Sequence, residues 1–496
     1  MKQVMRLIES LGGSHAQLPF LRWLGETDVV PAERKLRIGL LCAPFAMSFR
    51  DINVYHVSYG DDADMTPQQR LLSEHAAEDG THSKLFLRDA RTLEWDALTG
   101  FSAGQSLYWL TAHPHTEVDR AVAIRLAAQL ASTSNPRLRY PLVETIEVTG
   151  HAFFAQIVKP ARQFEEMTGK PLVFWGDGHL EMEAGHTTGD ESAFEGELTP
   201  QERTAAVGMV FDLFIDRERQ CNTWLHWGQK AEAADPSGVF ATRLDQSSLP
   251  TEPGPTMWET ATQLKTHPSH KPLLDRLNHQ LDDLARVTRA NRASSNRNDP
   301  LSLLRSALLF SAVETAWLPG IFRYVLPYPS PLGADEAAVN ELAASLPVLL
   351  PPAGTSQDWR LLAMDTWLEW GFADTIEFLH LNEATEPTRE LRAAVTRHLA
   401  QTSDPLVRAW IALTACTNAQ TRQETALAAA AELWPDPRAA LPLLAGHGQI
   451  SPTARESLAH LLNTPLTENA ARRIGEAIDD IAAAYQRCAH AERARA

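Results

Sequence analysis

One short stretch, Glu74 to Asp89, most constrains what this chain can fold into. It reads EHAAEDGTHSKLFLRD and places two histidines and two acids at steps of 3, 4 and 7 residues: His75, Glu78, Asp79 and His82. On a helix with 3.6 residues per turn, such positions share one face. Imidazole and carboxylate groups together are a donor set for divalent iron or manganese. We therefore expect a helix here whose buried face binds metal.

Two further stretches carry the same kind of pattern. The first has Glu144, Glu147 and His151 at steps of 3 and 7 residues, and the second has His179, Glu183 and His186 at steps of 4 and 7. Bundle proteins hold two irons with inward-facing Glu and His side chains, commonly as an acid followed three residues later by His. The predicted ligands are His75, Glu78, His82, Glu144, Glu147, His151, His179, Glu183 and His186. Asp79 and Asp89 are expected to orient those ligands through hydrogen bonds.

Composition excludes several classes of partner. The 496 residues include 62 acidic and 45 basic side chains, for a net charge of −17, which disfavours nucleic acid and anionic membrane surfaces as partners. The longest apolar run, Ile38 to Phe49, contains Pro44 and falls well short of the roughly 20 residues that span a bilayer. The four cysteines form no CxxC pair, as expected of reduced thiols in a cytoplasmic protein. We expect a soluble, cytoplasmic chain.

The chain reads as all-α and divides into three parts. Residues 1–233 contain the three stretches and are closed by a helix that starts at Thr199 and Pro200. Residues 234–300 read as a linker with one helix, because four prolines fall between 236 and 255. Residues 301–496 read as a second all-helical domain without a ligand constellation. No repeat of fixed period is found there, so a HEAT-like stack is kept only as an alternative.

Two local expectations concern the helices around the second ligand stretch. Thr116 and Asp119 have the spacing of a capping box for the helix that follows them. Pro136 to Pro141 is expected to interrupt the preceding helix, so that the second ligand helix begins after this stretch and runs to about Val158.

The sequence resembles a known family at these motifs. The blocks HAAEDGTHSKLFLRD and FWGDGHLEMEAGH, followed by a helix beginning LTPQER, are similar to the haem-oxygenase-like di-iron oxidases over about residues 20–230. The resemblance implies a helical bundle with two Fe(II) ions that activates dioxygen to oxidise a small amino-acid-like or fatty-acid-like substrate. The family usually has Asp at the position of Glu183 and Glu at the position of His75. Either His75 or Glu78, and either Glu144 or Glu147, would fill the family's ligand positions.

Other functions are consistent with the same residues. A haem-binding protein of this fold needs only one His as ligand and would leave most of these donors unexplained. A non-catalytic helical scaffold would carry the His and Glu rows as solvated helix faces and use residues 301–496 as a protein-binding surface. A ferritin-like bundle would supply two Glu-x-x-His units, of which the sequence has one. For residues 301–496 we consider two partners, a second copy of the chain or a carrier protein.

Overall fold

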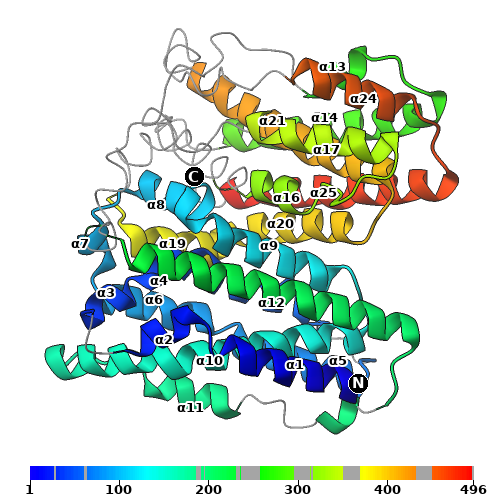
Figure 1. Ribbon diagram of the computed structural model, residues 1–496. Coiled ribbons are helices and arrows are strands. Elements are labelled where there is room, and N and C mark those ends of the chain that lie inside the picture. Colours follow the sequence, from blue (N-terminus) through cyan, green and yellow to red (C-terminus); the bar gives the residue numbers. More distant parts are fainter. Residues whose placement is uncertain are drawn as a thin grey trace. The chain divides into compact units, whose positions relative to one another are not determined.

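The computed structural model is helical throughout the part of the chain that it describes, which confirms the all-α class (Figure 1). The structure describes residues 1–26, 30–60, 64–185, 191–194, 196–230, 235, 257–294, 313, 317–349, 369–431 and 450–493. None of the helices in these ranges combines the length and apolarity needed to cross a membrane.

The chain forms two compact units, and each contains a short segment from the other half of the sequence. Unit 1 comprises Met1–Phe101, His113–Thr242 and Gly371–Leu381, and unit 2 comprises Ser102–Ala112, Arg243–Trp370 and Asn382–Ala496. The predicted linker, residues 234–300, contains α13 (Met257–Gln263) and α14 (Lys271–Ser294), and both helices belong to unit 2.

Unit 1 is a bundle around four helices: α4 (Ile38–Ile52), α9 (Glu117–Ala131), α10 (Pro136–Thr168) and α12 (Pro200–Gly228). α12 packs against the other three, and α4 also packs against α9. The other elements of unit 1 are α1 (Lys2–His15), α2 (Pro19–Gly25), α3 (Ala32–Leu36), the π-helix η1 (Asn53–Val57), α5 (Pro67–Asp79), α6 (His82–Thr92), α7 (Trp95–Thr99), η2 (Pro114–Thr116), α11 (Asp177–Gly185), η3 (Glu191–Phe194) and α19 (Phe372–Leu381).

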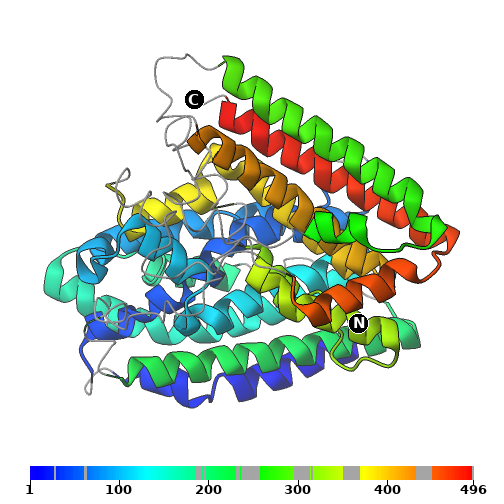
Figure 2. The ribbon, with the colours of Figure 1, turned by 90° about the horizontal axis from the view of Figure 1, so that it is seen from above.

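Unit 2 is a second bundle, in which α14 and α25 (Glu468–Arg493) lie side by side (Figures 1 and 2). Its remaining elements are α8 (Ala103–Thr111), α13, η7 (Pro268–His270), α16 (Leu318–Tyr324), α17 (Ala334–Leu349), η8 (Glu383–Thr385), α20 (Glu386–Ala400), α21 (Pro405–Ala431) and α24 (Pro452–Asn463).

Local sequence signals explain where the site helices begin and end. Thr66 caps α5 in a capping box with Gln69, and Pro67 occupies the first turn. The predicted capping box at the start of α12, between Thr199 and Glu202, is present. The expected single helix over the first ligand stretch is wrong, because the chain turns at Gly80 and Thr81 and divides it into α5 and α6. Glycine is a weak helix former, which favours the interruption there.

Two other local expectations need correction. The preceding helix, α9, ends at Ala131, and the stretch from Pro136 to Pro141 does not separate it from the second ligand helix but forms the start of that helix. Asn135 caps α10, Pro136 occupies its first turn, and the helix continues through Pro141 and Pro160 to Thr168. The capping box at Thr116 is absent, since the Thr116 hydroxyl donates to the carbonyl of His113 at 3.1 Å and Asp119 lies buried in the bundle.

A turn before α9 recurs in unit 2 at positions 269 residues later. In unit 1, Arg120 donates to the carbonyl of His113 at 2.9 Å and to the hydroxyl of Thr116 at 2.5 Å. In unit 2, Arg389 donates to the carbonyl of Asn382 at 3.0 Å and to the hydroxyl of Thr385 at 2.6 Å. The side chains of His113 and Asn382 each accept a hydrogen bond from the backbone N–H two residues later.

A second group of contacts recurs with the same separation. The Tyr59 hydroxyl donates to the carbonyl of Ser134 at 3.0 Å, and the Tyr328 hydroxyl donates to the carbonyl of Ser403 at 2.6 Å. The guanidinium of Arg139 lies over the Tyr59 ring, 4.4 Å from its centre, and that of Arg408 lies 4.8 Å from the centre of Tyr328.

The helices and the exchanged segments follow the same numbering. α9 and α20 begin 269 residues apart, as do α10 and α21. Each unit also contains one segment that its position in the sequence would assign to the other unit. These segments are Ser102–Ala112 in unit 2 and Gly371–Leu381 in unit 1, and they too are 269 residues apart. The chain therefore contains an internal structural repeat in which the two bundles exchange one helix, α8 for α19.

The repeat predicts that Arg139 and Arg408 have equivalent, local roles. Arg139 donates to the carbonyls of Leu130, Thr133 and Val57, and Arg408 donates to those of Leu326 and Thr402. We expect Arg139→Met to lower the local opening free energy by about 2 kcal/mol, the size of a lost hydrogen bond from a charged group. Hydrogen exchange read by mass spectrometry should rise around residues 53–59 and 130–135 in that variant.

Arg408→Met is the matched variant and should raise exchange around residues 320–328 and 400–406. Each variant serves as the control for the other unit. Equal acceleration in both units by either variant would contradict the assignment of one arginine to each repeat.

Candidate metal centre and cavity

Three buried side chains of unit 1 converge on one point. His75 and Asp79 extend from α5 and Glu147 extends from α10, and one ligand atom of each lies within 4.8 Å of the others. The His75 Nε2 atom is 3.1 Å from Asp79 Oδ2 and 3.4 Å from Glu147 Oε1. Metal–ligand bonds of about 2.1 Å place neighbouring ligand atoms about 3 Å apart, so this donor cluster fits a divalent ion. We refer to these three residues as the donor cluster.

The charges of the donor cluster depend on one another. Burial lowers the pKa of His75, but the carboxylates of Asp79 and Glu147 raise it more through hydrogen bonds and charge, to about 10. In the absence of metal, the imidazole is therefore a cation between two carboxylates. Metal ligands of these types are neutral imidazole and ionised carboxylate, so a bound ion would replace that proton.

Two more histidines lie beside the donor cluster. His82, at the start of α6, has its Nδ1 atom 3.8 Å from Asp79 Oδ1. Its ring meets that of His179 edge to face, with centres 4.6 Å apart. The Nδ1 atom of His179 is 2.7 Å from the carbonyl oxygen of Phe174. Because a carbonyl only accepts, Nδ1 carries the proton and Nε2 is the nitrogen with the lone pair that metal ligation requires.

Asp89 fixes the segment that leads to His179. Its carboxylate accepts hydrogen bonds from the backbone N–H groups of Val173, Phe174 and Trp175 at 2.8, 2.8 and 3.0 Å. Burial raises the pKa of Asp89 and these three bonds lower it, with burial the larger effect. Asp89 thereby orients the carbonyl of Phe174 that holds the His179 ring.

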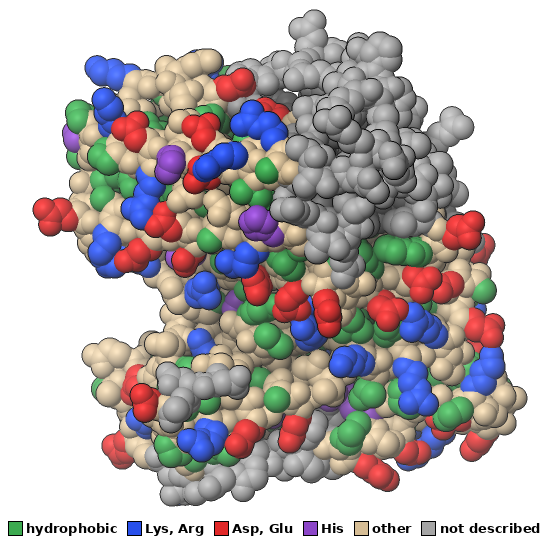
Figure 3. Space-filling view, turned by 180° about the vertical axis from the view of Figure 1, so that it is seen from behind, with side chains coloured by type: hydrophobic (Ala, Val, Ile, Leu, Met, Phe, Trp, Pro, Cys, Tyr) green, Lys and Arg blue, Asp and Glu red, His purple; other side chains and the backbone are tan. Residues whose placement is uncertain are grey.

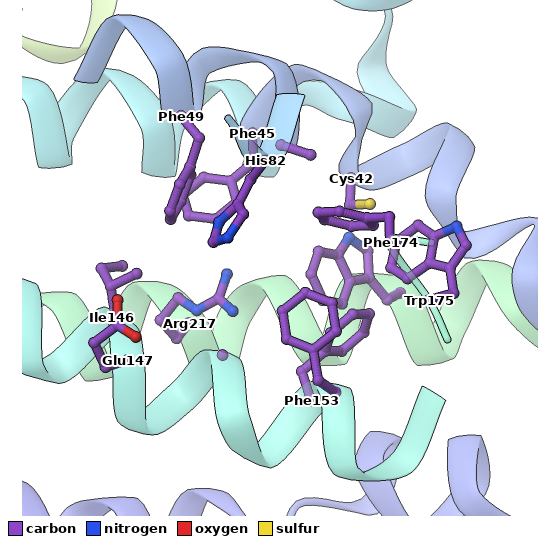
Figure 4. A pocket seen from close by; sticks show the side chains of 14 residues that line it. Cys42, Phe45, Phe49, His82, Ile146, Glu147, Phe153, Phe174, Trp175 and Arg217 are labelled. Atoms are coloured by element: carbon purple, nitrogen blue, oxygen red, sulfur yellow. The ribbon is translucent and has the colours of Figure 1, made fainter. Parts of the chain in front are cut away.

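A cavity adjoins His82 and Glu147 (Figure 4). It provides about 70 Å³ for the centres of water-sized molecules, and most of its wall is aromatic. The residues that line it are Cys42, Phe45, Ala46, Phe49, His82, Ile146, Glu147, Gly150, Phe153, Phe154, Phe174, Trp175, Arg217 and Trp224. A smaller cavity of about 20 Å³ adjoins Asp79 and Glu147 and is otherwise lined almost entirely by apolar side chains. The donor cluster therefore lies next to space that a small organic molecule can enter.

The structure places the other predicted ligands unequally. Glu144 is buried one turn before Glu147 on α10, whereas Glu78 and His151 are exposed and lie outside the donor cluster. Asp79, expected only to orient ligands, is itself a member of the cluster. The backbone of Glu183 belongs to α11, but its side chain is not described, and His186 lies outside the described residues.

A buried polar network around Asp119 and Arg217 was not predicted from the sequence. The Asp119 carboxylate accepts hydrogen bonds from Gln220 Nε2 at 2.6 Å and from Trp224 Nε1 at 3.1 Å. Arg217 on α12 donates from Nε to the Thr149 hydroxyl at 3.2 Å and from Nη1 to Gln220 Oε1. The only sequence signal for this network is that an acid and an arginine fall at positions otherwise occupied by apolar residues in α9 and α12.

The repeat in unit 2 lacks the donors of unit 1. The positions 269 residues after Glu144 and Glu147 are Leu413 and Cys416, and both are buried. The positions equivalent to His75 and Asp79 are Ala344 and Val348. Among the described residues, the cluster that could hold a metal therefore lies in unit 1.

Comparison with known proteins does not extend this assignment. No model of a known protein family matches the chain, and no curated protein matches its sequence. The chemistry of the site is consequently argued from its own residues.

The network around Asp119 predicts a pH dependence of stability. Complete burial raises the pKa of Asp119 from 3.8 to about 7. Between these values the folded protein keeps a proton that the unfolded chain has released, so raising the pH destabilises the folded state, and the loss is complete above about 7. Over this pH range, the free energy of unfolding of the wild type should fall by on the order of a few kcal/mol relative to that of Asp119→Asn, since one pKa unit is about 1.4 kcal/mol.

Urea unfolding at pH 5, 6, 7 and 8 measures this difference. Glu94→Gln is the control, because Glu94 is exposed and Lys170 lowers its pKa, so its removal leaves this pH range unaffected. A wild type and Asp119→Asn variant with parallel pH profiles would show that Asp119 ionises at its ordinary pKa.

Proposed function

We propose that unit 1 is a metal-dependent oxidase or oxygenase that uses iron and dioxygen to oxidise a small organic substrate. The observation that carries the proposal is the buried donor cluster of His75, Asp79 and Glu147 at the wall of an aromatic cavity. Imidazole and carboxylate donors suit iron, and the resemblance of the three ligand stretches to haem-oxygenase-like di-iron oxidases favours the same metal. Iron(II) bound there would supply the electrons that reduce dioxygen.

Other residues of the chain have separate roles in this function. Asp79 and Glu147 would offset the charge of a divalent ion in a largely buried site. Glu144, His82 and His179 are the nearest described candidates for further ligands, and two ions need some of them in addition to Glu183 and His186. The aromatic side chains of the cavity exclude water from the substrate and leave an apolar surface for its body.

The donor cluster also argues against a purely structural bundle. Burying one imidazole and two carboxylates costs free energy that an apolar core of the same volume would avoid. The equivalent positions of unit 2 show such an apolar alternative, with Leu413 and Cys416 in place of the two glutamates. Unit 2 is accordingly proposed to be the non-catalytic repeat, and unit 1, which has the donor cluster beside the cavity, the catalytic one.

The test is metal analysis after anaerobic reconstitution with ferrous iron. We expect about two irons per wild-type chain, and a loss of at least half of the bound iron in Asp79→Asn and Glu147→Gln, because each variant removes an anionic ligand. His151→Ala and Glu78→Gln are the matched controls, since both side chains are exposed, and both should retain wild-type iron.

Mixing the reconstituted protein with oxygen in a stopped-flow spectrometer tests the chemistry. A transient visible absorption that Glu147→Gln lacks would support the oxidase. A Soret band in the purified protein would instead indicate a haem-binding protein, and wild-type iron content in both cluster variants would refute the proposed site.

A further inference from the structure

Arg217 is a buried cation on the wall of the cavity that adjoins the donor cluster. Its side chain is 4% exposed, and Figure 4 shows its guanidinium between Glu147 and the aromatic group formed by Phe153, Phe174 and Trp175. An arginine is rarely buried to this extent unless a negative charge or a full set of acceptors compensates it.

No carboxylate in the described part of the chain forms an ion pair with Arg217, and the charge of buried Asp119 acts on it only from beyond Gln220. The hydrogen bonds of Arg217 go to the neutral Thr149 hydroxyl and the neutral Gln220 amide, and no described carboxylate is within ion-pairing distance. The same Gln220 side chain donates to Asp119, so a neutral amide separates the two charges. The nearby thiols of Cys42 and Cys221 are neutral as well, because burial raises the pKa of each.

The guanidinium is held in a fixed orientation toward the cavity. Its Nε and Nη1 atoms are engaged by Thr149 and Gln220, and its plane lies against Phe45 and Trp224, 5.0 and 5.9 Å from the ring centres. Within the described residues, Nη2 makes no hydrogen bond. A planar guanidinium with one free edge suits a carboxylate, which accepts its N–H groups in the same plane.

We propose that Arg217 binds the carboxylate of the substrate, so that the cavity selects small organic acids with an apolar body. The cavity volume of about 70 Å³ holds roughly five to seven water-sized groups, at about 10–15 Å³ for each. An acid seated on Arg217 places its apolar chain against the aromatic wall at one side of the guanidinium or toward His82 and Glu147 at the other. The identity of the reaction rests on the proposed function, but the binding of an acid does not.

The test compares an acid with its neutral amide on metal-free full-length protein at pH 7. Pentanoate and pentanamide have the same shape, and ligand-observed NMR titration measures their Kd values. The wild type should bind pentanoate at least tenfold more tightly, about 1.4 kcal/mol, because the ionised carboxylate accepts charge-assisted hydrogen bonds that the amide lacks. Arg217→Gln should lose this preference. Arg217→Lys, which keeps the charge without the fork, should retain a preference reduced at least threefold.

Asp79→Asn separates this inference from the proposed function. Its preference for pentanoate should equal that of the wild type, because it alters the donor cluster and leaves Arg217 in place. A preference that disappears in Asp79→Asn, or that survives in Arg217→Gln, would overturn the role of Arg217. Iron that fails to bind while the acid preference persists would refute the proposed metal centre and leave Arg217 as the anchor of an acid.

Discussion

The structure of unit 1 depends on how it compensates charges that it removes from water. Two groups of ionisable side chains are buried beside one cavity, His75 with Asp79 and Glu147, and Arg217 with Asp119 nearby; Glu147 and Arg217 line the cavity itself. In the first group a proton on His75 offsets the two carboxylates, which raise the pKa of that imidazole to about 10. The second uses neutral donors and acceptors from Gln220, Trp224 and Thr149, which satisfy hydrogen bonds without forming an ion pair. Buried charge in a low-dielectric interior is expensive unless it is paired or hydrogen-bonded, so both groups depend on these contacts.

The two groups contrast with the outer surface of the molecule. Acidic and basic side chains alternate over the face shown in Figure 3, where ion pairs are screened by water and contribute little. Arg91, for example, pairs with Asp374 and Glu377 with all three side chains nearly half exposed. The net charge of −17 describes the whole chain, whereas the candidate site of unit 1 involves a few charges buried inside the bundle.

The sequence predicted the helical class and some residues of the donor cluster better than the geometry of that cluster. Helical spacing identified His75 and Glu147, and it correctly favoured an all-α fold, because period and residue type are local properties. Spacing alone does not fix which face of a helix is buried, so Glu78 was named although it is exposed and Asp79 was not named as a ligand. Arg217 could not be predicted, since one arginine in an amphipathic helix reads as a solvated residue until its burial is known.

The internal repeat was missed for a related reason. Helical packing needs only apolar residues of suitable size at suitable positions, and these diverge freely as long as the volume is kept. The residues that recur make specific hydrogen bonds from their side chains to the backbone. Thr116 in unit 1 corresponds to Thr385 in unit 2, and Arg139 corresponds to Arg408. They are too few and too far apart to appear as a sequence period, whereas the constant separation of 269 residues is evident once their contacts are known.

The exchange of α8 and α19 changes how the C-terminal half should be regarded. α19 packs on α4, α6 and α7 within unit 1, where Phe372 meets Trp95 and the backbone N–H of Ala373 donates to Asp96. α6 begins with His82 and contains Asp89, which together place two histidines beside the donor cluster. Removing the residues after 300 would therefore remove a helix from unit 1 itself. A functional defect in such a truncation would follow from an incomplete bundle, and it would not by itself assign unit 2 a role in docking a carrier.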